Sequence, residues 1–153
     1  MNKITGNHLK ITSVIIGFIA TLMIVFPALS TSGSNDSYTG LQVVFGHEFI
    51  DFGGFGSGEI KFSFINLIAY SLPLIAALVL LFTKANRLTS TILFGVAAVL
   101  LFLVIEFTVV TVTILGSVNV IDVEWRYAIG LIIAASLSII GCAIGAFSVY
   151  KKV

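Results

Sequence analysis

Apolar residues dominate four long stretches of the chain, which cover residues 11–29, 64–82, 88–115 and 127–150. A helix needs about 20 mostly apolar residues to cross the hydrocarbon core of a bilayer. Each stretch is about that long or longer, so the pattern predicts four transmembrane helices. We therefore expect a mainly α integral membrane protein, with a four-helix transmembrane bundle in a single domain over residues 1–153.

The two segments predicted to lie outside the membrane, 30–63 and 116–126, show a shorter period. In residues 59–64, apolar and polar side chains alternate strictly, which is typical of a half-buried β-strand. Further strand candidates are 41–45, 47–51 and 117–125. We expect these segments to form a small antiparallel β-sheet of three or four strands on the external ends of the helices.

Composition supports the membrane class. The chain is 58% hydrophobic and 10% charged, with a mean hydropathy of +1.15, whereas soluble domains are about 25% charged. A net charge of +1 does not provide the basic surface that nucleic acid requires. The one cysteine, Cys142, can form neither an intramolecular disulfide nor a cysteine-based metal motif.

The charged residues are segregated along the chain. Six of the eight basic residues are Lys3, Lys10, Lys84, Arg87, Lys151 and Lys152, in the N-terminal arm, the second connection and the C-terminal tail. Six of the seven acidic residues lie in the two external segments, and Glu106 is the exception. The positive-inside rule then predicts a multi-pass protein of the plasma membrane with both termini in the cytoplasm.

An alternative interpretation concerns the N-terminus. Residues 1–30 have a basic start, an apolar stretch and the sequence "ALS", which together resemble a secretory signal peptide. The apolar stretch is longer than the usual core of about 7–15 residues, so we favour a retained first helix. Cleavage would leave three spans.

Small residues recur at helical spacing. In the fourth helix they are Gly130, Ala134, Ser138, Gly141 and Gly145, and in the first helix Ser13, Gly17 and Thr21. Small side chains let membrane helices approach closely. We interpret them as packing seams within one chain, and a homo-oligomer contact is the alternative.

Glu106 lies within the third apolar stretch, with no basic residue within one helical turn. Counting to a similar depth in the other helices predicts a buried polar layer of Glu106, Tyr70, Ser71, Thr21 and Ser136. Intramembrane acids often serve as proton or cation sites. The alternative, which we favour, is a neutral acid that fixes the register of the helices.

The external stretch "GHEFIDFGGFGSGEIKF" concentrates polar residues around glycines. Its charged and titratable members are His47, Glu48, Asp51, Glu59 and Lys61. His47 and Glu48 are adjacent, so on a strand they would point apart and make a poor metal site. The glycines lack the Lys-Ser/Thr of a phosphate loop, and no nucleophile–base–acid set is present. We predict a recognition hairpin with no catalytic residues, cofactor or metal.

The segment "IKFSFINLIAYSLPLIAALVLLF" resembles the second helix of small, mostly uncharacterised four-span membrane proteins of low-GC Gram-positive bacteria and mollicutes. The order of helices and loops also resembles the claudin-like tetraspan layout, as an analogy of architecture. The tryptophan and paired cysteines of the claudin first loop are missing from residues 30–63. The resemblance implies a plasma-membrane location and no particular activity.

These observations favour a non-enzymatic membrane protein that acts through protein–protein or envelope contacts, with a protein partner or self-association in addition to the lipid bilayer. One alternative is a small transporter, channel or immunity-type protein that uses Glu106. Another is a membrane enzyme. The two halves of the chain share no clear internal repeat, which transporters often have.

Overall fold

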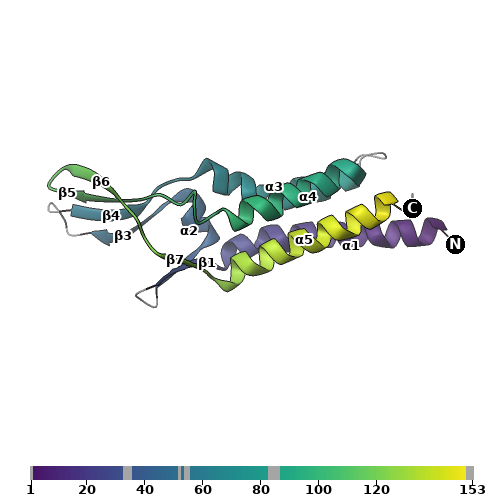
Figure 1. Ribbon diagram of the computed structural model, residues 1–153, viewed down its shortest axis with the longest axis horizontal. Coiled ribbons are helices and arrows are strands. Elements are labelled where there is room, and N and C mark those ends of the chain that lie inside the picture. Colours follow the sequence, from purple (N-terminus) through teal and green to yellow (C-terminus); the bar gives the residue numbers. More distant parts are fainter. Residues whose placement is uncertain (1, 33–35, 52, 54–55, 83–86, 151–153) are drawn as a thin grey trace.

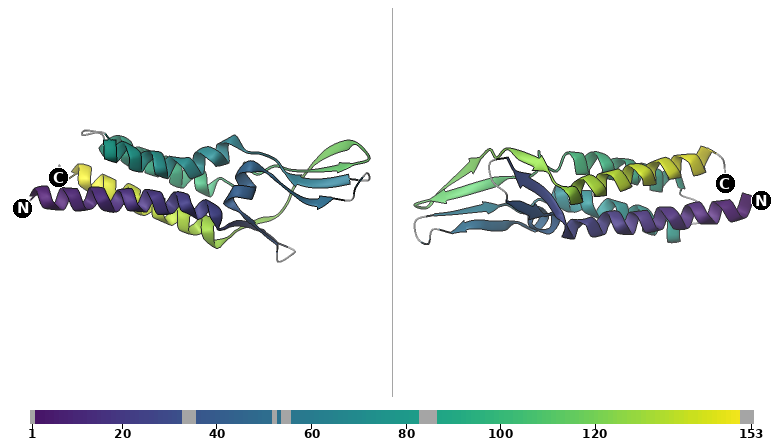
Figure 2. Two further views of the ribbon diagram at one scale, coloured as in Figure 1. Left: turned by 180° about the vertical axis from the view of Figure 1, so that it is seen from behind. Right: turned by 90° about the horizontal axis from the view of Figure 1, so that it is seen from below.

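The computed structural model describes residues 2–32, 36–51, 53, 56–82 and 87–150. The molecule is elongated, with long helices at one end and two β-sheets at the other (Figure 1). Both ends of the chain lie at the helical end, away from the sheets (Figures 1 and 2). Lys84, Lys151 and Lys152, which contribute to the predicted orientation, lie outside the described residues.

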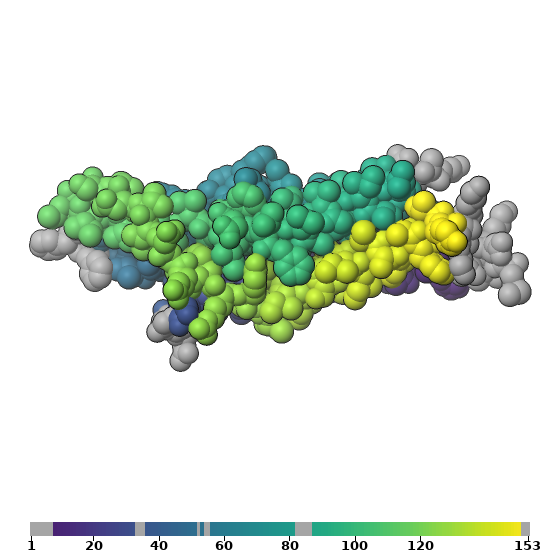
Figure 3. All heavy atoms as spheres, in the orientation of Figure 1, coloured from purple at the N-terminus to yellow at the C-terminus, as the bar shows by residue number. Residues whose placement is uncertain are grey.

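The four longer helices are α1 (Asn2–Leu22), α3 (Phe64–Phe82), α4 (Arg87–Phe102) and α5 (Ile129–Tyr150). Helix α1 packs against α3 and α5, and α4 packs against the same two helices. Figure 3 shows α4 and α5 side by side along one face. Three helices, α1, α3 and α5, are long and apolar enough to cross a membrane.

The predicted four-helix transmembrane bundle is wrong. Helix α4 has 16 residues, or about 24 Å at 1.5 Å per residue, which is shorter than the hydrocarbon core of about 30 Å. The predicted third span, 88–115, is divided among α4, a turn over 103–107 and strand β5 (Val110–Ile114). The second half of that span is rich in β-branched residues, which favour a strand over a helix.

The first predicted span, 11–29, also ends earlier than expected. After α1 comes one 3₁₀ turn, η1 (Met23–Val25), and then strand β1 (Pro27–Thr31). Pro27 has no backbone N–H and therefore cannot continue a helix, whereas it can start a strand. Strand β1 pairs antiparallel with β2 (Ser37–Thr39) on one side and with β7 (Trp125–Tyr127) on the other.

A second, four-stranded antiparallel sheet has the order β3-β4-β5-β6. Its strands are β3 (His47–Asp51), β4 (Gly56–Ile60), β5 and β6 (Ser117–Ile121). Strand β3 coincides with the weaker candidate 47–51, but the predicted strand 59–64 is displaced, because β4 ends at Ile60 and α3 begins at Phe64. Residues 52, 54 and 55 of the predicted glycine turn lie outside the described residues.

The strand predicted at 41–45 is instead a short helix, α2 (Gly40–Phe45). Thr39 and Gln42 form a capping box, in which each side chain bonds the other residue's backbone N–H. Such a box satisfies donors at the helix start. This local signal overrides the β-propensity of Val43 and Val44, which are fully buried on the inner face of α2.

The main core lies where the helices meet the sheets. It unites buried residues of both, among them Leu29, Val44, Ile60, Tyr70, Leu101 and Val110. A buried polar contact crosses this junction, because the Asn66 Nδ2 atom donates to Thr108 Oγ1 at 3.1 Å. Asn66 is fully buried, so it links the start of α3 to the segment before β5.

Two glycine positions hold the helices close together. A Cβ atom on Gly17 of α1 would lie 2.5 Å from the carbonyl oxygen of Pro73 in α3. A Cβ on Gly141 of α5 would lie 2.8 Å from the ring of Phe94 in α4. Of the other predicted packing residues, Gly130, Ala134 and Ser138 are buried, and Gly145 faces Thr91. Gly17, Gly141 and Gly145 thus lie at contacts between helices of the same chain.

Candidate functional site

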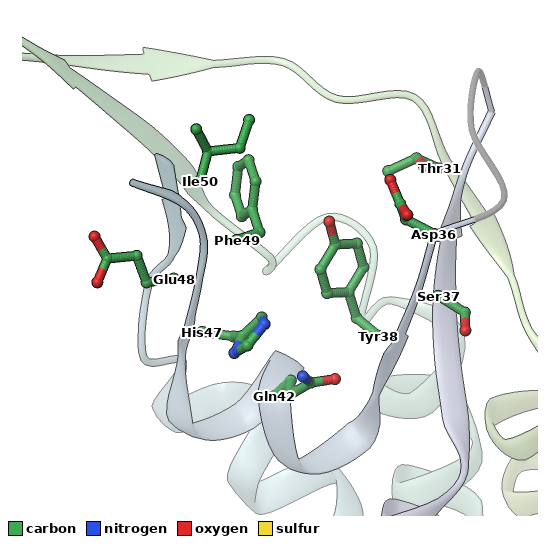
Figure 4. Close-up of a pocket in the computed structure, with 9 residues that line it drawn as sticks. All are labelled: Thr31, Asp36, Ser37, Tyr38, Gln42, His47, Glu48, Phe49 and Ile50. Carbon is green, nitrogen blue, oxygen red and sulfur yellow. The ribbon is translucent and has the colours of Figure 1, made fainter. Parts of the chain in front are cut away.

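A groove of about 550 Å³ separates the two sheets (Figure 4). Strands β1 and β2 with the start of α2 form one wall, and β3 forms the other. The lining residues are Thr31, Asp36, Ser37, Tyr38, Gln42, His47, Glu48, Phe49 and Ile50. The groove is within the size range of small-ligand and side-chain pockets, about 300–1,000 Å³.

Tyr38 is the centre of the groove. Its ring lies 6.1 Å from the rings of both His47 and Phe49 on β3, and 5.6 Å from the indole of Trp125 on β7. The tilted and edge-on angles are those that aromatic pairs favour. Because these rings come from both sheets, Tyr38 joins the sheets at the base of the groove.

The environment of Tyr38 also changes its acidity. Burial raises the pKa of the Tyr38 hydroxyl above its usual value of 10.0, and the nearby carboxylate of Asp36 raises this pKa further. Both effects disfavour the phenolate, because a buried charge loses solvation and two negative charges repel each other. The tyrosine therefore remains a neutral hydrogen-bonding group at physiological pH.

Alternation along β3 decides which side chains enter the groove. His47 and Phe49 point toward Tyr38, whereas the carboxylate of Glu48 points away from it (Figure 4). Gly58 on the neighbouring strand leaves room for Phe49, because a Cβ there would lie 2.8 Å from its ring. Gly46, with a φ of +90°, turns the chain from α2 into β3 in a conformation that favours glycine.

The predicted recognition hairpin is therefore divided. His47 and Glu48 line the groove, whereas Asp51, Glu59 and Lys61 are not among its lining residues. Glu59 and Lys61 form an ion pair with each other, and Asp51 accepts a hydrogen bond from the backbone N–H of Gly53 at 2.7 Å. Tyr38 lines the groove and contacts Trp125, but neither aromatic residue lies in a local motif that marks it as part of a site.

Glu106 lies outside helix α4, at an exposed position in the turn that follows it. It borders a second cavity, of about 350 Å³, together with Asp122, Glu124 and Trp125. Glu106 was the one acidic residue outside the two predicted external segments. In the structure it lies at the sheet end with the other acidic residues. It does not belong to a polar layer among the helices.

The other members of the predicted polar layer are distributed differently. Ser136 is exposed on α5, and the Ser71 hydroxyl donates to the Leu67 carbonyl oxygen of its own helix. Buried Tyr70 OH and Thr21 Oγ1 have no hydrogen-bond partner among the described residues. Without Glu106, these positions provide no charged group inside the helical region.

The described residues contain no group of three or more His, Cys, Asp or Glu side chains that could hold a metal ion. Comparisons with models of known protein families, with curated proteins and with solved structures find no match to this chain. The resemblance of residues 60–82 to small four-span proteins therefore stays a prediction.

Proposed function

We propose that the protein is a non-enzymatic integral protein of the plasma membrane that acts through protein–protein or envelope contacts made by its two sheets. The observation that carries this proposal is that the acidic residues lie at the sheet end, whereas long stretches of the helices carry no charged residue. No charged residue occurs between Ile11 and Phe26, between Phe64 and Phe82, or between Ile129 and Tyr150. All seven acidic residues lie between Asp36 and Glu124, in segments outside those helices.

The helical surface supports insertion in lipid. Large apolar side chains on its outer face are exposed, including Ile15, Phe18, Ile92, Ile132 and Ile139. In water such a surface would be a strong aggregation liability, whereas hydrocarbon tails solvate it. Lys3 and Lys10 lie in α1 and Arg87 begins α4, so the positive-inside rule favours cytoplasmic termini and sheets outside the cell.

The sheet end offers two surfaces for contacts. One is the groove around Tyr38. The other is the β5–β6 hairpin, where every residue of edge strand β6 is exposed and Val118 and Val120 are 62% and 72% exposed. Exposed apolar edge strands are typical sites for pairing with another chain. Transport through Glu106 has less support, because its side chain is exposed at the sheet end.

A labelling experiment tests the topology. Cys142 is replaced by serine, and a single cysteine is introduced either at Asn119, in β6, or at His8, in α1. We expect a membrane-impermeant maleimide to label Asn119→Cys in intact cells, and His8→Cys only after the membrane is permeabilised. The reverse pattern, or recovery of the chain in the soluble fraction, would contradict the proposal.

A photo-crosslinking experiment tests the contacts. A benzophenone amino acid is placed at exposed Ile50 or Asn119 of the sheets, or at exposed Ile139 of α5. We expect discrete protein adducts from the two sheet positions and lipid adducts from Ile139. Protein adducts from Ile139 alone would instead identify the helices as the contact surface, and the proposed role of the sheets would be wrong.

A further inference from the structure

The groove around Tyr38 lies between two strand edges. Strand β2 is at the edge of the three-stranded sheet, and β3 is at the edge of the four-stranded sheet. Residues of both strands line the groove from opposite sides (Figure 4). An edge strand presents backbone N–H and C=O groups that can pair with an added extended chain. The geometry therefore suits an extended peptide better than a compact ligand.

The charge of the lining residues indicates which kind of peptide would bind in the groove. Asp36 is acidic, and none of the nine lining residues is lysine or arginine. Glu48 is the other acidic lining residue, but its carboxylate points away from Tyr38 (Figure 4). The sheet end as a whole carries seven acidic residues, against Lys61 and Arg126 as its basic ones. A negative cleft attracts cations and raises their rate of association.

Tyr38 adds an observation that is independent of charge. Its side chain is only 9% exposed, and its hydroxyl points into the space between the two walls (Figure 4). A tyrosine hydroxyl can both donate and accept a hydrogen bond, so a ligand that enters the groove can pair with it. The aromatic rings beside it also attract ammonium and guanidinium groups.

We propose that this groove binds an extended segment of a partner protein, with one lysine or arginine side chain placed beside Asp36 and the Tyr38 hydroxyl. The segment adds to the edge of β2 or β3 through its backbone, and its cationic side chain occupies the groove. This inference rests on the proposed contact function, and it specifies the chemistry of the partner.

The test uses the full chain in lipid nanodiscs and the fluorescence of Trp125. This is the only tryptophan, and its ring contacts Tyr38. The probe is the peptide acetyl-Thr-Val-Lys-Val-Thr-amide. Matched peptides carry norleucine or glutamate in place of lysine, and butylamine supplies the cation without a backbone. We expect the lysine peptide to bind at least about tenfold more tightly than the norleucine peptide, and more tightly than butylamine.

Variants locate the site. Asp36→Asn removes the carboxylate beside Tyr38, and we expect it to weaken binding of the lysine peptide by about fivefold or more. Asp51→Asn is the matched control, because Asp51 lies on β3 outside the groove lining, and we expect a change within about twofold. Tyr38→Phe keeps the ring and removes the hydroxyl, so we expect it to weaken binding of the lysine peptide as well. Circular dichroism and thermal melting establish that each variant is folded.

Three results would overturn the proposal. Equal binding of the lysine, norleucine and glutamate peptides would exclude a cation site. Equal binding of butylamine and the lysine peptide would exclude a peptide site. Equal losses in Asp36→Asn and Asp51→Asn would indicate a diffuse field of charge. The maleimide labelling described above is a separate measurement, so peptide binding with inverted labelling would refute the proposed topology and leave the groove assignment standing.

Discussion

The helical end and the sheet end of this molecule bury apolar side chains in opposite ways. At the helical end, contacts depend on small residues such as Gly17 and Gly141, and large apolar side chains point outward. At the sheet end, large residues such as Tyr38 and Ile60 point inward, and charged residues are found mainly in this part. The difference follows from the solvent, because helices in lipid gain nothing from hiding apolar surface, whereas sheets in water do.

The largest expected effect is at the sheet end. Tyr38→Ala removes the ring that contacts three others across the two sheets, and we expect a loss of about 3–5 kcal/mol in the free energy of unfolding. Hydrogen exchange should increase in β1, β2 and β3 more than in α3 or α5. Tyr150→Ala is the control, because Tyr150 is 86% exposed. Equal destabilisation of both ends would show that the two regions unfold as one.

The matching test of the helical end is Gly17→Ala. The added Cβ would collide with the carbonyl oxygen of Pro73, which is backbone and cannot rotate away, so we expect a loss of about 1–3 kcal/mol. In Gly95→Ala the new Cβ would meet only the Cys142 sulfur, at 3.5 Å, and stability should change little. Thermal unfolding in detergent compares the two. Equal melting temperatures would refute close packing of α1 on α3.

The junction between the two regions depends on Asn66. In Asn66→Ala, Thr108 loses a buried hydrogen bond, and we expect a loss of about 1–3 kcal/mol. Asn119→Ala, on exposed β6, is the matched control. Chemical denaturation monitored by Trp125 fluorescence measures both. An unchanged midpoint for Asn66→Ala would mean that the hydrogen bond does not hold the sheets to the helices.

A smaller effect is expected from alkaline pH. The pKa of Tyr38 is raised in the folded state, so the unfolded chain releases this proton first, near pH 10. The resulting stabilisation is fully present below that pH and is lost as pH rises through the folded pKa. The wild-type chain should therefore lose more stability than Tyr38→Phe between neutral pH and the alkaline range. Parallel pH profiles of the two melting temperatures would contradict this.

The smallest effect is expected for Glu106→Gln. Glu106 is exposed at the sheet end, so removal of its charge should change the free energy of unfolding by no more than about 0.5 kcal/mol. Proton and cation flux in proteoliposomes should also be unchanged. A large loss of stability, or loss of a measurable flux, would indicate that Glu106 lies in the membrane interior. The acidic residues would then not be confined to the sheet end.

Local patterns identified several elements of the sheet end but not their boundaries. The strand candidates 47–51 and 117–125 coincide with β3 and contain β6, whereas the strictly alternating segment 59–64 overlaps β4 only at its start. Apolar character alone could not separate the end of α4 from β5, because hydropathy is the same for a helix and a buried strand of valines. The segment 41–45 was misassigned because a capping box at Thr39 and Gln42 outweighed β-propensity.

The candidate site, too, could be predicted only in part from the sequence. Residues 47–51 were recognisable as a polar external strand, and alternation predicted that His47 and Glu48 point apart. Tyr38 and Trp125 are 87 positions apart in the printed sequence, and no local pattern relates them. Their contact exists because β1 pairs with β2 on one side and with β7 on the other. Pairing between distant strands depends on long-range packing, which a single sequence does not reveal.

Membrane character and the segregation of charge are properties of composition and order along the chain, so the printed residues alone determine them. Three helices are long and apolar enough to cross a membrane, and they correspond to three of the four spans that the apolar pattern predicted. The end of α4, the position of Glu106 and the groove between β2 and β3 depend on which distant segments pair. These features emerged only in three dimensions, because hydrogen bonding between strands and packing at the junction compete with local preference and outweigh it there.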